Sequence, residues 1–329
     1  MRERIHYIDV AKGILIMLVV FDHIPDMFFV RLGGANNSIR MINEMQWVYK
    51  CFFMPAFFIL TGYCSSFNAP FKPFIIKNFK SLVIPGIVIG LFDCLFNPNC
   101  TIRTIFFNII HDGGFYWFLV ALFEAKIIYY LLSKYIKDTW LIGIICLLLM
   151  LLGFAFNNLQ YRYQIYYFYY SFSLVFYIYV GQLLKINNIN MIWLVLLSVL
   201  FILTIALCYS YGHVTPQVVQ GFENPVTDIP LSLLVSLSGS AFLLLVSKLI
   251  CNNRILEFFG RNSLVFYTLE FSVIVSIEYV LLNDFCLDLS TTKGAVLFVF
   301  VTFVFTLIVL SMFTRLLRTK RLKWVLGGF

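Results

Sequence analysis

Charged residues are scarce in this chain, at 12% of its 329 residues. A soluble domain carries about a quarter, so these charges are too few to cover an aqueous surface, and they exclude an ordinary soluble protein. No polar stretch is long enough for an independent soluble domain. Length alone suggests two soluble domains, but the 61% hydrophobic content overrides that expectation and favours one membrane domain over residues 1–329.

Metal-binding patterns are missing as well. The eight cysteines form no C-x-x-C pair and no metal-ligand spacing, so we expect no metal site. Four of them fall inside apolar runs, where cysteine behaves as a small hydrophobe; these are Cys51, Cys94, Cys146 and Cys208. Cys100 and Cys286 lie in expected outer loops, which leaves a bridge between them open.

The sequence also lacks the features of a nucleic-acid partner. The net charge of +8 includes no basic block interleaved with exposed aromatic residues. Lysine and arginine instead collect at the ends of apolar segments, as charges that orient membrane proteins do. No internal repeat stands out, which argues against the inverted-repeat transporter folds.

Apolar runs of about twenty residues recur along the chain, and this length crosses the hydrocarbon core as a helix. We therefore predict an all-α integral membrane protein with about ten transmembrane helices. The expected spans lie near residues 8–29, 47–66, 74–96, 115–133, 139–156, 164–184, 191–211, 229–250, 262–282 and 294–314. Pro55 is expected to kink the second span, and Pro85 and Asp93 interrupt the third.

Positive charge sets the expected orientation. With an inner N-terminus, most lysines and arginines fall on inner segments, including the tail at 315–323. This asymmetry predicts that both termini are cytoplasmic. Because the first apolar stretch contains Lys12, Asp22 and His23, we expect a spanning helix there rather than a cleaved signal.

The longest outer segments lie near 30–46, 97–114 and 212–228. They are expected either to bind a polar substrate or simply to connect the spans. Their polar side chains are Asn36, Asn37, His111, Asp112, His213, Glu223 and Asp228.

The first span holds ionisable residues, which are costly in a membrane and mark functional sites. Lys12 and His23 are eleven residues apart, so they share one helix face with about 16 Å between them. The histidine can act as a general base or nucleophile, and Asp26, one turn on, is better placed than Asp22 to contact its ring. Lys12 can pair with Asp9 on the same face. The alternatives are a structural histidine near a helix end and a lysine that reaches to water.

Polar residues also fall inside two later spans. Glu124 and Lys126 lie in the fourth span, two positions apart and therefore not facing each other. Ser263, Tyr267 and Glu270 follow i, i+4, i+7 spacing and form a polar stripe on the ninth. Each residue alone is typical of a buried polar contact, but together they indicate a hydrated interior.

Five short motifs resemble those of the membrane acyltransferase 3 family. Asp9-x-x-Lys12-Gly13 followed by His23 is similar to the family's first-helix signature, in which a basic residue precedes an essential histidine by ten intervening positions. The other four run in order along the chain: 53–62 (FMPAFFILTG) resembles F-x-M-P-x-F-F-x-x-S/T-G, 82–85 (LVIP) resembles L-x-x-P, 117–119 (WFL) resembles W-F-L, and 259–267 (FGRNSLVFY) resembles G-x-N-S-L-x-I-Y.

Two positions depart from the family's pattern. Lys12 stands where many members have arginine, so bidentate binding of a phosphate or carboxylate is lost. The Y-x-x-H often found after the ninth-span motif reads Tyr267-Thr268-Leu269-Glu270, so a second histidine is absent. These departures bear on the substrate more than on the family.

The resemblance implies a stand-alone O-acetyltransferase, because no SGNH-type soluble domain follows. Such an enzyme would move an acyl group, expected to be acetyl, from acetyl-CoA or another acyl-CoA to a hydroxyl of an envelope polysaccharide or lipid-linked sugar. We then expect a multi-pass protein of a bacterial inner membrane, in contact with membrane lipid, with acyl-CoA as co-substrate and no bound cofactor. The oligomeric state is not set by the sequence.

In that reading His23 is the catalytic residue, as general base or acyl carrier, and Lys12 at the inner end neutralises donor charge. The other expected binding residues are Asp9, Asp22, Trp117, Glu124, Asn262, Tyr267 and Glu270. The alternative is a transporter or exporter of an anion or sugar that performs no acyl transfer, since such proteins use the same residue types along their paths.

Overall fold

The computed structural model describes residues 5–31, 36–96, 101–110, 116–158, 167–187, 190–210, 224–285, 289 and 291–326. Within these ranges every regular element is a helix and none is a strand, which confirms the predicted all-α class. The chain divides into two compact units, Met1–Lys50 with Ile250–Trp324, and Cys51–Leu249 with Val325–Phe329. The prediction of one functional domain over 1–329 stays a prediction.

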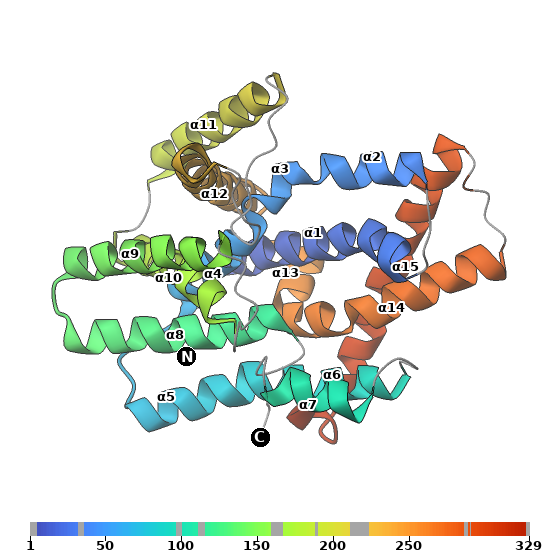
Figure 1. The fold of residues 1–329 in the computed structure, drawn as a ribbon, viewed down its shortest axis with the longest axis horizontal. Coiled ribbons are helices and arrows are strands. Elements are labelled where there is room, and N and C mark those ends of the chain that lie inside the picture. The colour runs from blue at the N-terminus through green and yellow to red at the C-terminus, as the bar shows by residue number, and fades with distance from the viewer. Residues whose placement is uncertain are drawn as a thin grey trace. The chain divides into compact units, whose positions relative to one another are not determined.

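The first unit joins the two ends of the chain. Its helices are α1 (His6–Arg31), α2 (Asn37–Met45), α3 (Trp47–Lys50), α13 (Arg254–Arg261), α14 (Ser263–Asn283) and α15 (Thr292–Leu317). The long helix α1 packs against α13, α14 and α15 (Figure 1). Segments from the start and the end of the sequence therefore share one core.

The second unit is built around α10, which packs on α4, α8 and α9. Its helices are α4 (Phe53–Cys64), α5 (Phe71–Asn78), α6 (Ile84–Phe96), α7 (Ile102–Ile110), α8 (Trp117–Tyr135), α9 (Thr139–Asn158), α10 (Phe168–Asn187), α11 (Met191–Ser210) and α12 (Pro225–Leu249). A π-helical turn, η1 (Phe79–Val83), joins α5 to α6, and a short 3-10 helix, η2 (Lys323–Leu326), ends the described chain.

Seven helical segments among the described residues are long and apolar enough to cross a membrane. The expected first, fourth and sixth spans correspond to α1, α8 and α10, which are helices of 26, 19 and 20 residues outside that set. Ionisable residues in α1 and α8, and tyrosines in α10, lower their hydropathy. The count of about ten and the cytoplasmic termini stay predictions.

Two prolines act differently from the expected simple kinks. The predicted second span breaks at Cys51 and Phe52, so Pro55 lies in the first turn of α4, where its missing N–H would have had no helical partner. Pro85 follows the π-helical turn, in which the Ile84 N–H donates to the Phe79 carbonyl. A wider turn before a proline gives its ring room, so the third span continues through Pro85.

Two of the expected loops contain helices. The segment near 30–46 forms α2, where the Asn36 side chain accepts the Ile39 N–H at 3.0 Å and so caps the helix. The segment near 97–114 forms α7, and α12 begins before its expected start. The expected loop residues His111, Asp112, His213 and Glu223 lie outside the described residues.

The cysteines correct another expectation. Cys94 was expected to be a small hydrophobe in an apolar run, but it is disulfide-bonded. Cys51, Cys146 and Cys208 are buried in apolar surroundings, as predicted, and form no disulfide. The open question of a Cys100–Cys286 bridge also lies outside the described part of the chain.

Candidate functional site

The helix α1 carries Lys12 and His23 on one continuous helix, as predicted, three turns apart. Pro25 lies inside the same helix and cannot donate to the Phe21 carbonyl. The buried Gln46 amide donates to that carbonyl instead, at 3.1 Å. A neighbouring side chain thus satisfies the backbone group that the proline leaves without a partner, as a membrane interior requires.

Glu270 is the side chain that holds His23. The His23 Nδ1 atom lies 3.0 Å from the Glu270 Oε1 atom, and the Glu270 side chain is 0% exposed. The Phe271 ring packs against the imidazole with 4.5 Å between ring centroids. An ionised Glu270 accepts the Nδ1–H, which selects the tautomer whose Nε2 atom carries a lone pair.

This contact corrects the expected partner of His23. Asp26 was expected to contact the imidazole, but it accepts a hydrogen bond from the Asn43 amide at 3.3 Å. Asp22 forms a buried ion pair with Lys50, at 3.0 Å between Oδ1 and Nζ. Asp26 therefore binds α2 and Asp22 binds α3, and both place charge close to the histidine.

Several buried polar atoms of this unit have no hydrogen-bond partner among the described residues. The Oε2 atom of Glu270 is one, and the hydroxyls of Thr302 and Thr306 on α15 are two more. Thr302 precedes Phe303, whose ring contacts that of Phe21 with centroids 5.7 Å apart, so it lies near the level of His23. Native proteins rarely leave such groups without a partner, so water or a polar ligand fits there.

Close contact between backbones joins the N-terminal half of α1 to α13. A Cβ atom at Gly13 would lie 2.0 Å from the Leu256 carbonyl oxygen, and one at Gly260 would lie 1.9 Å from that of Asp9. Only glycine permits this approach of α1 to α13. The glycines of the first and last motifs are therefore packing residues that meet across the chain's two ends.

An ion cluster lies beside this contact. The His6 Nδ1 atom donates to Glu257 Oε1 at 2.8 Å, and the Arg261 guanidinium donates to Glu257 Oε2. Arg261 also lies 3.6 Å from Asp9. The His6 hydrogen bond and the Arg261 charge hold the pKa of the Glu257 carboxyl below its ordinary value. The expected site residue Asp9 thus belongs to this ion cluster of His6, Glu257 and Arg261.

The remaining expected residues of this unit have mixed surroundings. Asn262, at the junction of α13 and α14, donates to the Phe258 carbonyl at 2.5 Å, and its Oδ1 atom is buried with no partner among the described residues. Tyr267 is buried on α14, one turn before Glu270. Lys12 is partly buried on α1, between Asp9 of the ion cluster and His23 along the helix.

Trp117 and Glu124 lie in the second unit. The Trp117 ring packs against Tyr170, at 4.9 Å between centroids. Glu124 is buried and accepts a hydrogen bond from Ser171 on α10 at 2.5 Å, so it is satisfied within the core of that unit. Their participation in the site of His23 stays a prediction.

Lys50 is a site residue that no sequence pattern indicated, because a lysine at the end of an apolar run ordinarily serves to orient a membrane protein. One signal was present for Gln46, because Pro25 frees a carbonyl that needs a donor. No cluster of metal ligands occurs within the described ranges.

The arrangement has the parts of a general-base catalyst. A histidine with one nitrogen held by a buried carboxylate can take a proton at its other nitrogen, while the carboxylate stabilises the imidazolium that forms. The fixed pair of Asp22 and Lys50 adds charge close by. Such a site suits transfer of a group to a hydroxyl.

Comparison with known proteins gives a match to one family. The family model, an acyltransferase domain of the acyltransferase 3 type, matches residues 5–315. Neither the curated proteins nor the solved structures give a match. The family match covers both units and all five motifs.

Proposed function

Because this chain belongs to the acyltransferase 3 family and is a membrane acyltransferase, we propose that it moves an acyl group, acetyl in the simplest case, from acyl-CoA to a hydroxyl. The acceptor in this proposal is an envelope polysaccharide or a lipid-linked sugar. The observation that carries the proposal is the 3.0 Å contact of His23 with the buried Glu270. It equips one imidazole for proton transfer in a chain whose family performs acyl transfer.

The proposed reaction uses the Nε2 atom of His23. It takes the proton of the acceptor hydroxyl as the oxygen attacks the thioester carbonyl carbon. The C–S bond breaks, the CoA sulfur leaves as a thiolate, and the imidazolium returns the proton to that sulfur. Glu270 keeps the ring oriented and stabilises its positive charge throughout. An alternative role of the same atom is attack on the thioester to form an acyl-histidine.

The proposed role of Lys12 is to neutralise negative charge of the donor. It lies three turns from His23, toward the end of α1 that is expected to face the cytoplasm, where acyl-CoA is found. Replacement by arginine keeps the charge, so Lys12→Arg should retain most of the transfer rate and Lys12→Ala should lose it. Equal rates in the two variants would remove this role.

The acceptor side of the proposal is supported by buried polar atoms in the unit that holds His23. The Oε2 atom of Glu270 and the hydroxyls of Thr302 and Thr306 are buried and open to hydrogen bonding. A sugar offers several hydroxyls to such groups. A multi-pass enzyme that acts on envelope glycans would lie in the inner membrane of a bacterium.

The test is incubation of the purified chain with acetyl-CoA that carries a radiolabelled acetyl group, together with lipid-linked oligosaccharide. Label in the glycan supports the proposal, and label that stays on the protein after a single turnover identifies an acyl-histidine. A transporter would instead move an unmodified solute into proteoliposomes without consuming acetyl-CoA. That result, with no labelled glycan, would overturn the proposal.

A further inference from the structure

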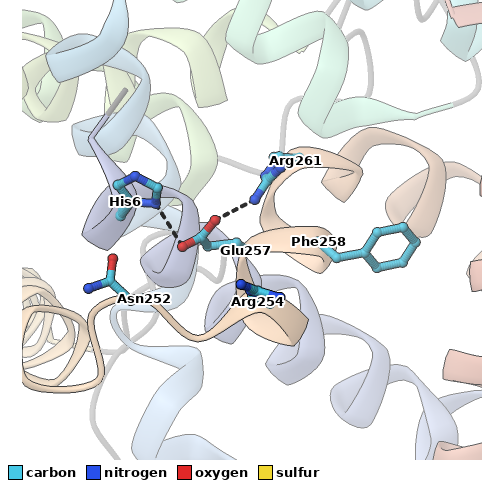
Figure 2. A pocket seen from close by; sticks show the side chains of 6 residues that line it. All are labelled: His6, Asn252, Arg254, Glu257, Phe258 and Arg261. Carbon is cyan, nitrogen blue, oxygen red and sulfur yellow. Dashed lines mark hydrogen bonds and ion pairs between the residues drawn. The ribbon is translucent and has the colours of Figure 1, made fainter. Parts of the chain in front are cut away.

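A pocket of about 600 Å³ opens beside α13 in the first unit and is not used by the chemistry at His23. It lies at the N-terminal end of α1, which is closer along the helix to Lys12 than to His23. Its lining is shown in Figure 2 and consists of His6, Asn252, Arg254, Glu257, Phe258 and Arg261. This volume is within the range of small-molecule sites.

The charge in this pocket suits an anion. Both oxygens of Glu257 are engaged, one by His6 and one by Arg261. Arg254 is exposed at the start of α13, and no carboxylate lies within ion-pairing distance of it in the described part of the chain. The Arg261 side chain is shared with Asp9, while Arg318 donates to the Arg261 carbonyl at 3.3 Å and adds a further cation.

The uncharged lining narrows the ligand class. The Phe258 ring offers a face on which a base can stack, and the Asn252 amide has donors and an acceptor for the edge of a base. Arg254 and Phe258 are four positions apart on α13, so they lie on the same face of that helix. A phosphate at Arg254 with a base at Phe258 matches a nucleotide, whereas a lipid headgroup uses the arginine but has no ring to stack.

We propose that this pocket binds the adenine nucleotide portion of the acyl-CoA donor, with a phosphate at Arg254 and the adenine against Phe258. The proposal rests on the proposed function for the identity of the donor as an acyl-CoA. It assigns the recognition of the donor to α13 and the preceding turn, separate from the proton transfer at His23. The ligand shares its phosphate chemistry with anionic lipid headgroups, so the experiment separates the two sources.

The test measures binding without reaction. The full chain is placed in nanodiscs of neutral phosphatidylcholine and titrated calorimetrically with adenosine 3′,5′-bisphosphate, and separately with phosphopantetheine, which has a phosphate but no base. We expect Arg254→Ala to weaken both about tenfold or more, because one charge-assisted hydrogen bond is lost. Phe258→Ala should weaken the bisphosphate nucleotide about tenfold and leave phosphopantetheine unchanged.

The matched control is Arg315→Ala. It removes an exposed cation from the last turn of α15 in the same unit, and Arg315 does not line the pocket. Its affinity for the nucleotide should equal that of the wild type. Arg254→Lys should recover part of the affinity that Arg254→Ala loses, since it restores the charge without the planar guanidinium.

Three outcomes would overturn the inference. Nucleotide affinity that does not change in Arg254→Ala and Phe258→Ala places the nucleotide elsewhere. If the nucleotide does not bind, but phosphatidylglycerol added to the nanodiscs binds in a way that depends on Arg254, the pocket is a lipid site. If Phe258→Ala binds both phosphopantetheine and the nucleotide with wild-type affinity, the adenine does not contact Phe258. If any of these outcomes occurs but the wild-type protein still transfers label from acetyl-CoA to glycan, only the pocket inference fails and the proposed function stands. If no label is transferred, the pocket inference and the proposed function both fail.

Discussion

The Nδ1 atom of His23 lies 3.0 Å from the Oε1 atom of Glu270, although 247 positions separate the two residues in the sequence. The contact joins α1 to α14 and gives the histidine a carboxylate that is fully buried. In the place where the family often has a second histidine, this chain therefore supplies the orienting acid. The site at His23 is assembled from the two ends of the chain.

Removing the charge of Glu270 should reduce catalysis without reducing substrate binding. Glu270→Gln keeps the size of the side chain but no longer selects the Nδ1–H tautomer, so kcat should fall about 100- to 10,000-fold with KM little changed. The control is Glu278→Gln, which alters another fully buried carboxyl of α14. The measurement is the initial rate of acyl transfer. Equal losses of activity in both variants, or no loss in either, would contradict the prediction.

The buried pair of Asp22 and Lys50 should be coupled in stability. Lys50→Met leaves the Asp22 carboxylate buried without its cation, which costs about 3–5 kcal/mol. The double variant Asp22→Asn with Lys50→Met should recover much of this loss, because neither charge remains. Thermal unfolding in detergent measures the cycle, with the exposed Lys293→Met as the neutral control. Strictly additive losses in the double variant would refute the coupling.

Gly260 should not tolerate a side chain. The added methyl group of Gly260→Ala would lie 1.9 Å from the Asp9 carbonyl oxygen, a backbone atom that cannot turn aside. We expect α1 and α13 to separate and the yield of folded protein to fall sharply. Gly86→Ala is the comparison, since its methyl group would lie 3.2 Å from the Leu119 side-chain end, which can move. Size-exclusion chromatography measures the yield of folded protein. Equal yields for the two variants would show that the contact of Gly260 with Asp9 is looser than described.

The contribution of Glu257 to stability should depend on pH. Its pKa is held below the ordinary value of 4.5 by the His6 hydrogen bond and by Arg261, so its carboxylate stabilises the fold fully above 4.5 and loses that effect as the pH falls through the lower value. Wild type should unfold at a higher temperature than Glu257→Gln at pH 7, and the gap should close below pH 4.5. Glu44→Gln, at an exposed acid of α2, should show no gap. A gap that is constant down to pH 3 contradicts the prediction.

Much of the fold could be predicted from the sequence because membrane helices are continuous apolar runs. Lys12 and His23 follow from helical geometry alone, since both lie on one helix. The expected kink at Pro55 was wrong, because the helix begins only two residues earlier and the break lies at Cys51 and Phe52. The start of a helix after a short break leaves no mark in an apolar run.

The partners in the site were harder to predict than its members. Glu270 was expected as a binding residue, but its pairing with His23 depends on how distant helices pack, which a single sequence does not encode in any local period. Asp26 lies one helical turn from His23 and was chosen over the adjacent Asp22 for that reason, yet Asn43 holds it. Lys50 lies where a basic residue ordinarily marks a membrane boundary, and only its ion pair with Asp22 shows that it neutralises that carboxylate.

The central claim is that His23 performs the proton transfer in acyl transfer from acyl-CoA. The most direct measurement is the rate at which labelled acetyl groups reach glycan with the purified His23→Ala variant, alongside its affinity for CoA. The account predicts a loss of at least about 1,000-fold in rate with CoA affinity unchanged. A variant that transfers label at the wild-type rate would contradict it.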